Sequence, residues 1–160
     1  MPPNRGTDLS TEQRQLRPRE ENDALGTWLE HLFDAASEVF VFTAPVLAVV
    51  MLAGDAELTF VAVAALVTMV LGVGLQRQRP LGPPWPKVTP LLGLLRLVVY
   101  NVAFAATLWI SEVAFTEPVV DISWASGPLV APSLVAVVLL AALVVAFPYL
   151  TVALGLHGTE

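Results

Sequence analysis

The stretch LTFVAVAALVTMVLGVGL, residues 58–75, decides the fold of this chain, because it is apolar almost throughout and contains no charged residue. A helix that crosses the hydrocarbon core of a bilayer needs about 20 predominantly apolar residues. Within lipid, the backbone satisfies its hydrogen bonds only as a helix or as a closed barrel. The stretch is therefore predicted to be a membrane-spanning helix.

Three further stretches have the same character and lie at 39–53, 91–111 and 129–147. The last extends to 156 if Pro148 bends the helix rather than ending it. The sequence thus predicts an all-α integral membrane protein whose four-helix membrane domain covers 39–156. The link over 54–57 has room only for a tight turn, so the four helices are expected to form two antiparallel hairpins.

The composition agrees with a membrane protein that carries a charged N-terminal segment. Of the 160 residues, 56 % are hydrophobic and 14 % are charged, whereas a soluble domain has about 25 % charged residues. The chain is acidic, with a net charge of −6, and Lys87 is its only lysine. This composition resembles that of proteins from salt-accumulating archaea.

The N-terminal part divides into two segments. Residues 1–23 are polar and rich in Pro, Arg and Glu, so they are predicted to be a disordered cytoplasmic tail. Residues 24–38 have an amphipathic helical pattern with acids on the polar face, and the acids favour contact with protein or cytoplasm over lipid. Since 39–53 is short for a bilayer, we predict that 24–38 continues into it as one helix, kinked at Pro45. The alternative is that 24–38 lies at the membrane surface as a separate helix.

A Pro-rich basic loop is expected at 76–90, after the second span. It is predicted to be a stiff connector anchored by Trp85, and a Pro-rich ligand for another protein is the alternative. This loop and the tail carry basic residues, whereas all the charged residues of the links at 54–57 and 112–127 are acidic. Because basic loops stay on the cytoplasmic side, both termini are predicted to be cytoplasmic, in the cell membrane.

Arg96 is the only basic residue within a predicted span, about five residues into the third helix. A guanidinium at that depth is costly unless it is paired or reaches the interface. The structural interpretation is that Arg96 reaches the interface or pairs with Glu38, which lies at a similar depth on the first helix. The functional interpretation is a site that binds an anion or couples transport.

Asn101 lies near the middle of the third span, and Thr107 follows it on the same helix. Thr68, on the second span, is at a matching depth and is a potential hydrogen-bond partner. The structural interpretation is an interhelical hydrogen bond, worth about 1 kcal/mol. The functional interpretation is a polar lining for a pore or a substrate cavity.

No constellation typical of an enzyme is present, so no catalytic residue, cofactor or metal site is expected. His31 and His157 are isolated, and acids outweigh the arginines of the tail, so nucleic acid is not an expected partner. The expected surroundings are the lipid bilayer and either a membrane protein partner or a second copy of the chain.

Two functions are consistent with the sequence. The first is a non-enzymatic accessory or scaffold component of the cell membrane. The alternative is a small oligomeric transporter or channel that uses Arg96, Asn101 and Glu38. The first is favoured because proton coupling needs a carboxylate well inside the membrane, and Glu38 and Glu112 lie only at its edges.

Overall fold

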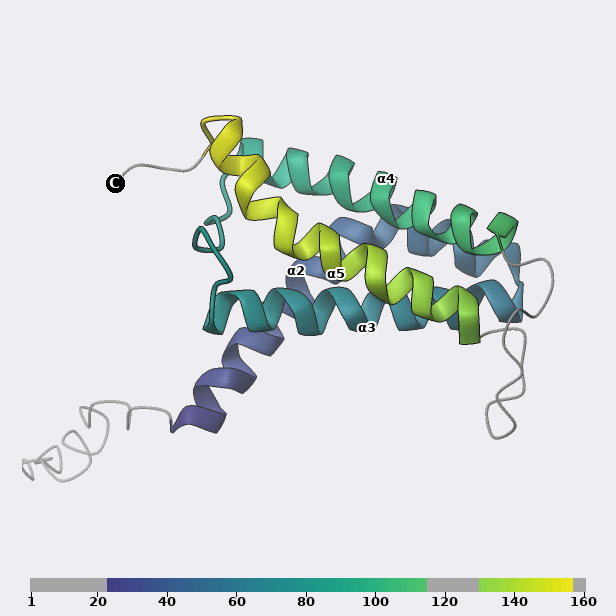
Figure 1. The fold of residues 1–160 in the computed structure, drawn as a ribbon, viewed down its shortest axis with the longest axis horizontal. Coiled ribbons are helices and arrows are strands. Elements are labelled where there is room, and N and C mark those ends of the chain that lie inside the picture. Colours follow the sequence, from purple (N-terminus) through teal and green to yellow (C-terminus); the bar gives the residue numbers. More distant parts are fainter. Residues whose placement is uncertain (1–22, 115–129, 157–160) are drawn as a thin grey trace, which may run out of the picture.

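The computed structural model describes residues 23–114 and 130–156, and these residues form helices and connecting loops without any strand. The helices are α2 (Ala24–Ala53), α3 (Ala56–Gln78), α4 (Pro90–Ala114) and α5 (Val130–Ala153), drawn in Figure 1. All four are long and apolar enough to cross a membrane. The predicted all-α class is therefore confirmed. Most of the predicted tail, and residues 115–127 of the predicted link at 112–127, lie outside the described residues.

Local capping signals set several of the helix ends. Asp23 begins α2 by accepting a hydrogen bond from the Gly26 N–H at 2.7 Å, and Gly54 ends this helix in the left-handed conformation, with φ 68°. Asp55 begins α3, where its side chain accepts from the backbone N–H groups of residues 57 and 58. Thr89 Oγ1 accepts from the Leu92 N–H at 3.3 Å at the start of α4.

The observed helices are longer than the predicted spans. The amphipathic stretch 24–38 and the span 39–53 form the single helix α2, with Pro45 inside it. Helix α3 continues to Gln78, so Arg77 lies on a helix and not in the loop. Helix α5 continues past Pro148 to Ala153. The extension of α3 matters most for the site, because it places a cation beside α2.

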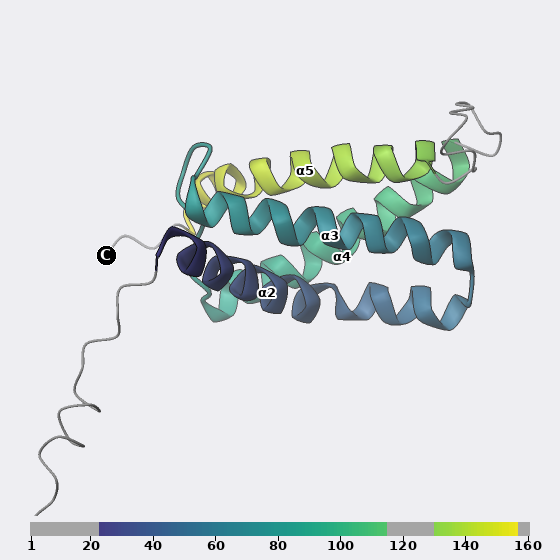
Figure 2. The same cartoon turned by 90° about the horizontal axis from the view of Figure 1, so that it is seen from below.

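The four helices lie side by side, with α2 against α3 and α4, and with α5 against the same two helices, as Figures 1 and 2 show. The start of α2, the loop between α3 and α4, and the end of α5 share one end of the bundle. At Gly72 of α3, an added Cβ would lie 3.2 Å from Val144 Cγ1 of α5, so glycine permits close packing there. Residues from all four helices are buried in the core, among them Val39, Ala65, Met69, Phe104 and Leu140.

Candidate functional site

A buried carboxylate, that of Glu38 on α2, is the centre of the candidate site. Glu38 is 6 % exposed. Its Oε2 atom accepts hydrogen bonds from Arg77 Nη2 at 2.6 Å and from Trp85 Nε1 at 3.3 Å. Its Oε1 atom accepts from the Tyr100 hydroxyl at 2.9 Å and lies 3.1 Å from Arg96 Nε in an ion pair. Both oxygens are thus fully used by groups within the protein.

We call Glu38, its four partners and the neighbouring acid of α2 the Glu38 cluster: Asp34, Glu38, Arg77, Trp85, Arg96 and Tyr100. Its members come from α2, α3, α4 and the loop between α3 and α4. Its two carboxylates and two guanidinium groups balance in charge. Charge balance and hydrogen bonds offset the large cost of taking ions out of water, so the cluster can lie among apolar helices.

Arg96 is fully buried within the cluster. Its Nη2 atom donates to the carbonyl oxygen of Pro86, and its guanidinium carbon lies 5.9 Å and 5.8 Å from the ring centroids of Trp85 and Phe147. Cations in this position over aromatic rings are attracted by the ring quadrupole. The sequence left two structural interpretations, that Arg96 reaches the interface or that it pairs with Glu38. In the structure Arg96 pairs with Glu38, and its buried side chain does not reach the surface.

Arg77 joins the two acids of α2, and the sequence analysis missed this role. Its Nη1 atom lies 3.1 Å from Asp34 Oδ2, while Nη2 bonds Glu38. The signal was present in two features: Asp34 and Glu38 are four residues apart on one helix face, and the tight link at Gly54 sets α3 against α2. The sequence analysis placed residue 77 in the basic loop and used that loop only to predict the orientation, so it did not predict this contact.

The loop between α3 and α4 is attached to the cluster. Besides the Trp85 and Pro86 contacts, the Leu81 N–H donates to Gln76 Oε1 at 2.7 Å, and the Tyr149 hydroxyl donates to the Leu81 carbonyl at 3.4 Å. Gly82 has φ 116°, and a Cβ there would collide with the Tyr149 hydroxyl oxygen. Glycine is therefore required for this loop to lie against α5.

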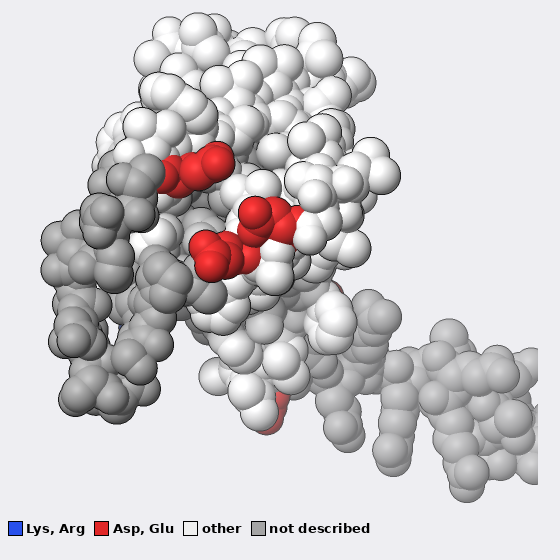
Figure 3. Space-filling view, turned by 90° about the vertical axis from the view of Figure 1, so that its right-hand side faces the viewer, with Lys and Arg blue, Asp and Glu red and all other residues white. Residues whose placement is uncertain are grey.

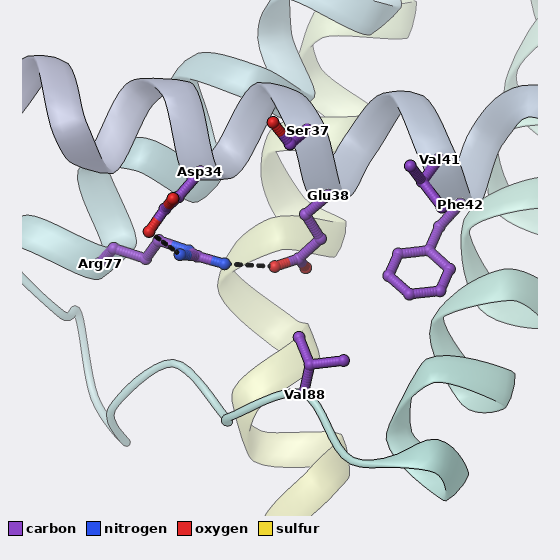
Figure 4. Close-up of a pocket in the computed structure, with 7 residues that line it drawn as sticks. All are labelled: Asp34, Ser37, Glu38, Val41, Phe42, Arg77 and Val88. Carbon is purple, nitrogen blue, oxygen red and sulfur yellow. Dashed lines mark hydrogen bonds and ion pairs between the residues drawn. The ribbon is translucent and has the colours of Figure 1, made fainter.

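An open pocket of about 370 Å³ adjoins the cluster. In Figure 4, the Arg77 fork points between Asp34 and Glu38, while Phe42 and Val88 lie on the other side of Glu38. Its lining comprises Asp34, Ser37, Glu38, Val41, Phe42, Arg77 and Val88. The pocket therefore has one charged side and one apolar side.

Asn101 connects α4 to the turn of α2 that contains Pro45. Its side-chain Nδ2 donates to the Phe42 carbonyl at 2.6 Å, and its Oδ1 accepts from the Val46 N–H at 2.9 Å. These two backbone groups are separated by four residues, so they would bond to each other in a regular helix. Pro45, between them, has no N–H and distorts the turn. The Asn101 amide thus bridges the turn that the proline disturbs, and we call this contact the Asn101 joint.

The expected partnership between Asn101 and Thr68 is wrong. The Thr68 hydroxyl donates to the Ala64 carbonyl of its own helix at 2.8 Å. A threonine in a helix commonly satisfies its hydroxyl in this way, whereas backbone groups beside a proline need an outside partner. Thr107 is buried on α4, but it is not among the residues bonded to Glu38 or Asn101. Within 23–114 and 130–156, no three His, Asp or Glu side chains form a metal-ligating group.

The fold is that of a protein with four described helices, each long and apolar enough to cross a membrane. A family model described as Domain of unknown function (DUF8215) matches residues 22–154, so the chain belongs to this family. The matched region includes all four described helices. No curated protein and no solved structure matches the chain.

Proposed function

We propose that this chain is a multi-pass protein of the cell membrane with a non-enzymatic accessory or scaffold role. The observation that carries the proposal is the Glu38 carboxylate, whose two oxygens are both used to join α2, α3, α4 and the loop. A carboxylate held in this way stabilises one arrangement of the helices. The role of such a chain is then to present a fixed membrane surface to a partner.

Membrane insertion is supported by the outward-facing side chains. Large apolar residues are exposed along α3 and α4, including Val63, Val67, Val98 and Val102. Such a surface is costly in water but favourable in lipid. In the proposed arrangement α2 pairs with α3 and α4 with α5, as two antiparallel hairpins.

Both termini are proposed to be cytoplasmic. The end of the bundle that carries the start of α2 also carries Arg77, Arg79 and Lys87. Figure 3 looks onto the opposite end, where acidic side chains are visible and no basic side chain is seen among the described residues in view. Basic residues favour the cytoplasmic side, and an even number of spans returns the chain to the side on which it began.

The orientation can be tested directly because the chain contains no cysteine. Single-cysteine variants at exposed, neutral positions, Ala56→Cys and Leu81→Cys, would be treated in intact cells with a membrane-impermeant maleimide. We expect labelling of Ala56→Cys from outside, and labelling of Leu81→Cys only after permeabilisation. The reverse pattern would overturn the orientation.

The accessory role is tested by affinity purification from native membranes in mild detergent. We expect a specific membrane protein to be recovered with the wild-type chain and lost with Glu38→Ala, whose helices no longer hold their arrangement. Glu112→Ala, which changes an exposed acid, is the matched control. Recovery of the chain alone, or only as a homodimer, would contradict the accessory role.

A small oligomeric transporter or channel is the second candidate, because an open pocket reaches a buried ion-paired carboxylate. Solute flux in proteoliposomes that Arg96→Ala or Asn101→Ala abolishes, while both variants stay folded, would favour this candidate over the accessory role.

A further inference from the structure

The pocket beside Glu38 has two walls of different chemistry. Asp34, Ser37, Glu38 and Arg77 form the polar wall, and Val41, Phe42 and Val88 form the apolar wall. A volume of about 370 Å³ lies within the range of about 300–1,000 Å³ that small-molecule pockets have. A ligand with a polar head and a compact apolar body would match both walls.

The charges indicate the sign of that head. The Glu38 cluster is neutral only while Arg77 lies between Asp34 and Glu38, since Arg96 contributes the other positive charge from a different side of Glu38. If the Arg77 side chain moves away, one negative charge remains uncompensated beside the pocket. Coulomb attraction to the buried Glu38 carboxylate is stronger than in water, so the vacated position favours a cation.

The shape of the head follows from the group that occupies the position now. The Arg77 guanidinium uses two nitrogens to reach two carboxylates, at 3.1 Å and 2.6 Å, as Figure 4 shows. A planar amidinium or guanidinium can form the same two charge-assisted hydrogen bonds. An apolar body on such a head would occupy the rest of the pocket, which is also lined by Val41, Phe42 and Val88.

Three observations indicate that Arg77 can be displaced. Its side chain is 19 % exposed, and its partner Asp34 is 61 % exposed, so both can exchange with water. Its Nε atom is buried without a hydrogen-bond partner, so its present position is incompletely satisfied. Glu38 would still be held by Arg96, Tyr100 and Trp85 after Arg77 leaves.

We propose that this pocket binds a small organic cation, an amidinium or guanidinium with an apolar body, and that Arg77 is the internal cation that the ligand displaces. The site goes beyond the proposed accessory role, and the maleimide labelling and purification tests do not depend on it.

The test is isothermal titration calorimetry on the full chain in detergent micelles, with benzamidinium chloride as the probe. Benzamide and benzoate, which have nearly the same shape but are neutral and negative, are the control ligands. Arg77→Gln removes the internal cation, Asp34→Asn removes one carboxylate, and Arg79→Gln removes an exposed arginine that does not line the pocket. Circular dichroism and thermal unfolding establish that each variant is folded.

We expect Arg77→Gln to bind benzamidinium about tenfold more tightly than the wild type, the change that one hydrogen bond to a charged group supports. Asp34→Asn should bind it more weakly, and Arg79→Gln should bind it as the wild type does. Benzamide and benzoate should give no measurable heat of binding.

Two results would overturn the proposal: Arg77→Gln binding benzoate in preference to benzamidinium, or neither the wild type nor Arg77→Gln binding benzamidinium at all. If Arg77→Gln does not fold, Asp34→Asn decides, because it changes an exposed side chain and leaves the Glu38–Arg77 pair in place. Equal benzamidinium affinity in Asp34→Asn and the wild type would then exclude the site.

Discussion

At the Glu38 cluster, two guanidinium groups, a tyrosine hydroxyl and a tryptophan N–H from α3, α4 and the loop converge on the carboxylate of α2, whereas at the Asn101 joint a single neutral amide bonds two backbone groups of α2. The two sites are neighbours along α2, because Glu38 precedes Phe42 by four residues. The first lies beside an open pocket, and the second lies at the turn of α2 that contains Pro45.

The difference shows two ways to bury polarity among apolar helices. The Glu38 cluster needs several residues to be correct together, because any missing partner leaves a charge uncompensated in a medium of low dielectric constant. The Asn101 joint needs only one side chain, because the backbone supplies the other donor and acceptor. The cluster should therefore be the more sensitive to substitution, and the following changes test this ranking.

The largest effect is expected for Glu38→Ala. It leaves the buried Arg96 guanidinium and the partly exposed Arg77 guanidinium without their shared carboxylate, and removing one partner of a buried ion pair typically costs about 3–5 kcal/mol. The free energy of unfolding, measured by titration with sodium dodecyl sulfate in mixed micelles, should fall by that amount. Glu112→Ala, at an exposed acid, should stay within about 0.5 kcal/mol of the wild type. A loss for Glu38→Ala no larger than for this control would show that the cluster does not stabilise the bundle.

A smaller effect is expected for Asn101→Leu, which leaves the Phe42 carbonyl and the Val46 N–H without their side-chain partner. We expect a loss of about 1–2 kcal/mol in the same assay, since buried unsatisfied groups are costly but a neutral bond in a membrane protein contributes modestly.

The link to the kink can be checked with a double-mutant cycle. In a Pro45→Ala background, residues 42 and 46 can bond to each other, so Asn101→Leu should cost less than in the wild type. If the cost is the same in both backgrounds, the amide does not act through the proline kink.

A loss of about 1 kcal/mol is expected for Gly82→Ala, because φ 116° is unfavourable for any residue with a Cβ. The new methyl group would also collide with Tyr149 and displace the loop from α5. In a Tyr149→Ala background the ring is absent, so Gly82→Ala should lose less free energy of unfolding than it does in the wild type. An equal loss in both backgrounds would assign the whole effect to the backbone conformation.

The smallest effect is expected for Thr68→Val. The Thr68 hydroxyl bonds only the Ala64 carbonyl in the contacts that the structure shows, and it connects no helices. The free energy of unfolding should change by less than about 0.5 kcal/mol. A loss as large as that of Asn101→Leu would show that Thr68 has an interhelical role after all.

The four helices were predictable because their causes are local, although α3 continues to Gln78, beyond the predicted end of its span at residue 75. Apolar stretches longer than a few turns indicated each of the four helices, and Asp55 and Thr89 cap α3 and α4 with side-chain hydrogen bonds of the kind that these residue types form at helix starts. The ion pair between Glu38 and Arg96 was one of two structural interpretations of Arg96. It was predictable because two opposite charges at a similar depth have few other partners among apolar residues. In each case, the deciding information lay within one turn of helix or in the depth along a span.

The sequence by itself determined the class of protein and the presence of polar residues that must find partners, because hydrophobicity, helix propensity and capping depend on neighbours along the chain. Only the tertiary structure decided which partners they find: Arg77 with Asp34 and Glu38, Trp85 with Glu38, and Asn101 with the proline kink. These choices depend on helix rotation and register and on the path of the loop. They arise when all four helices pack at once, and no single stretch of the chain encodes them.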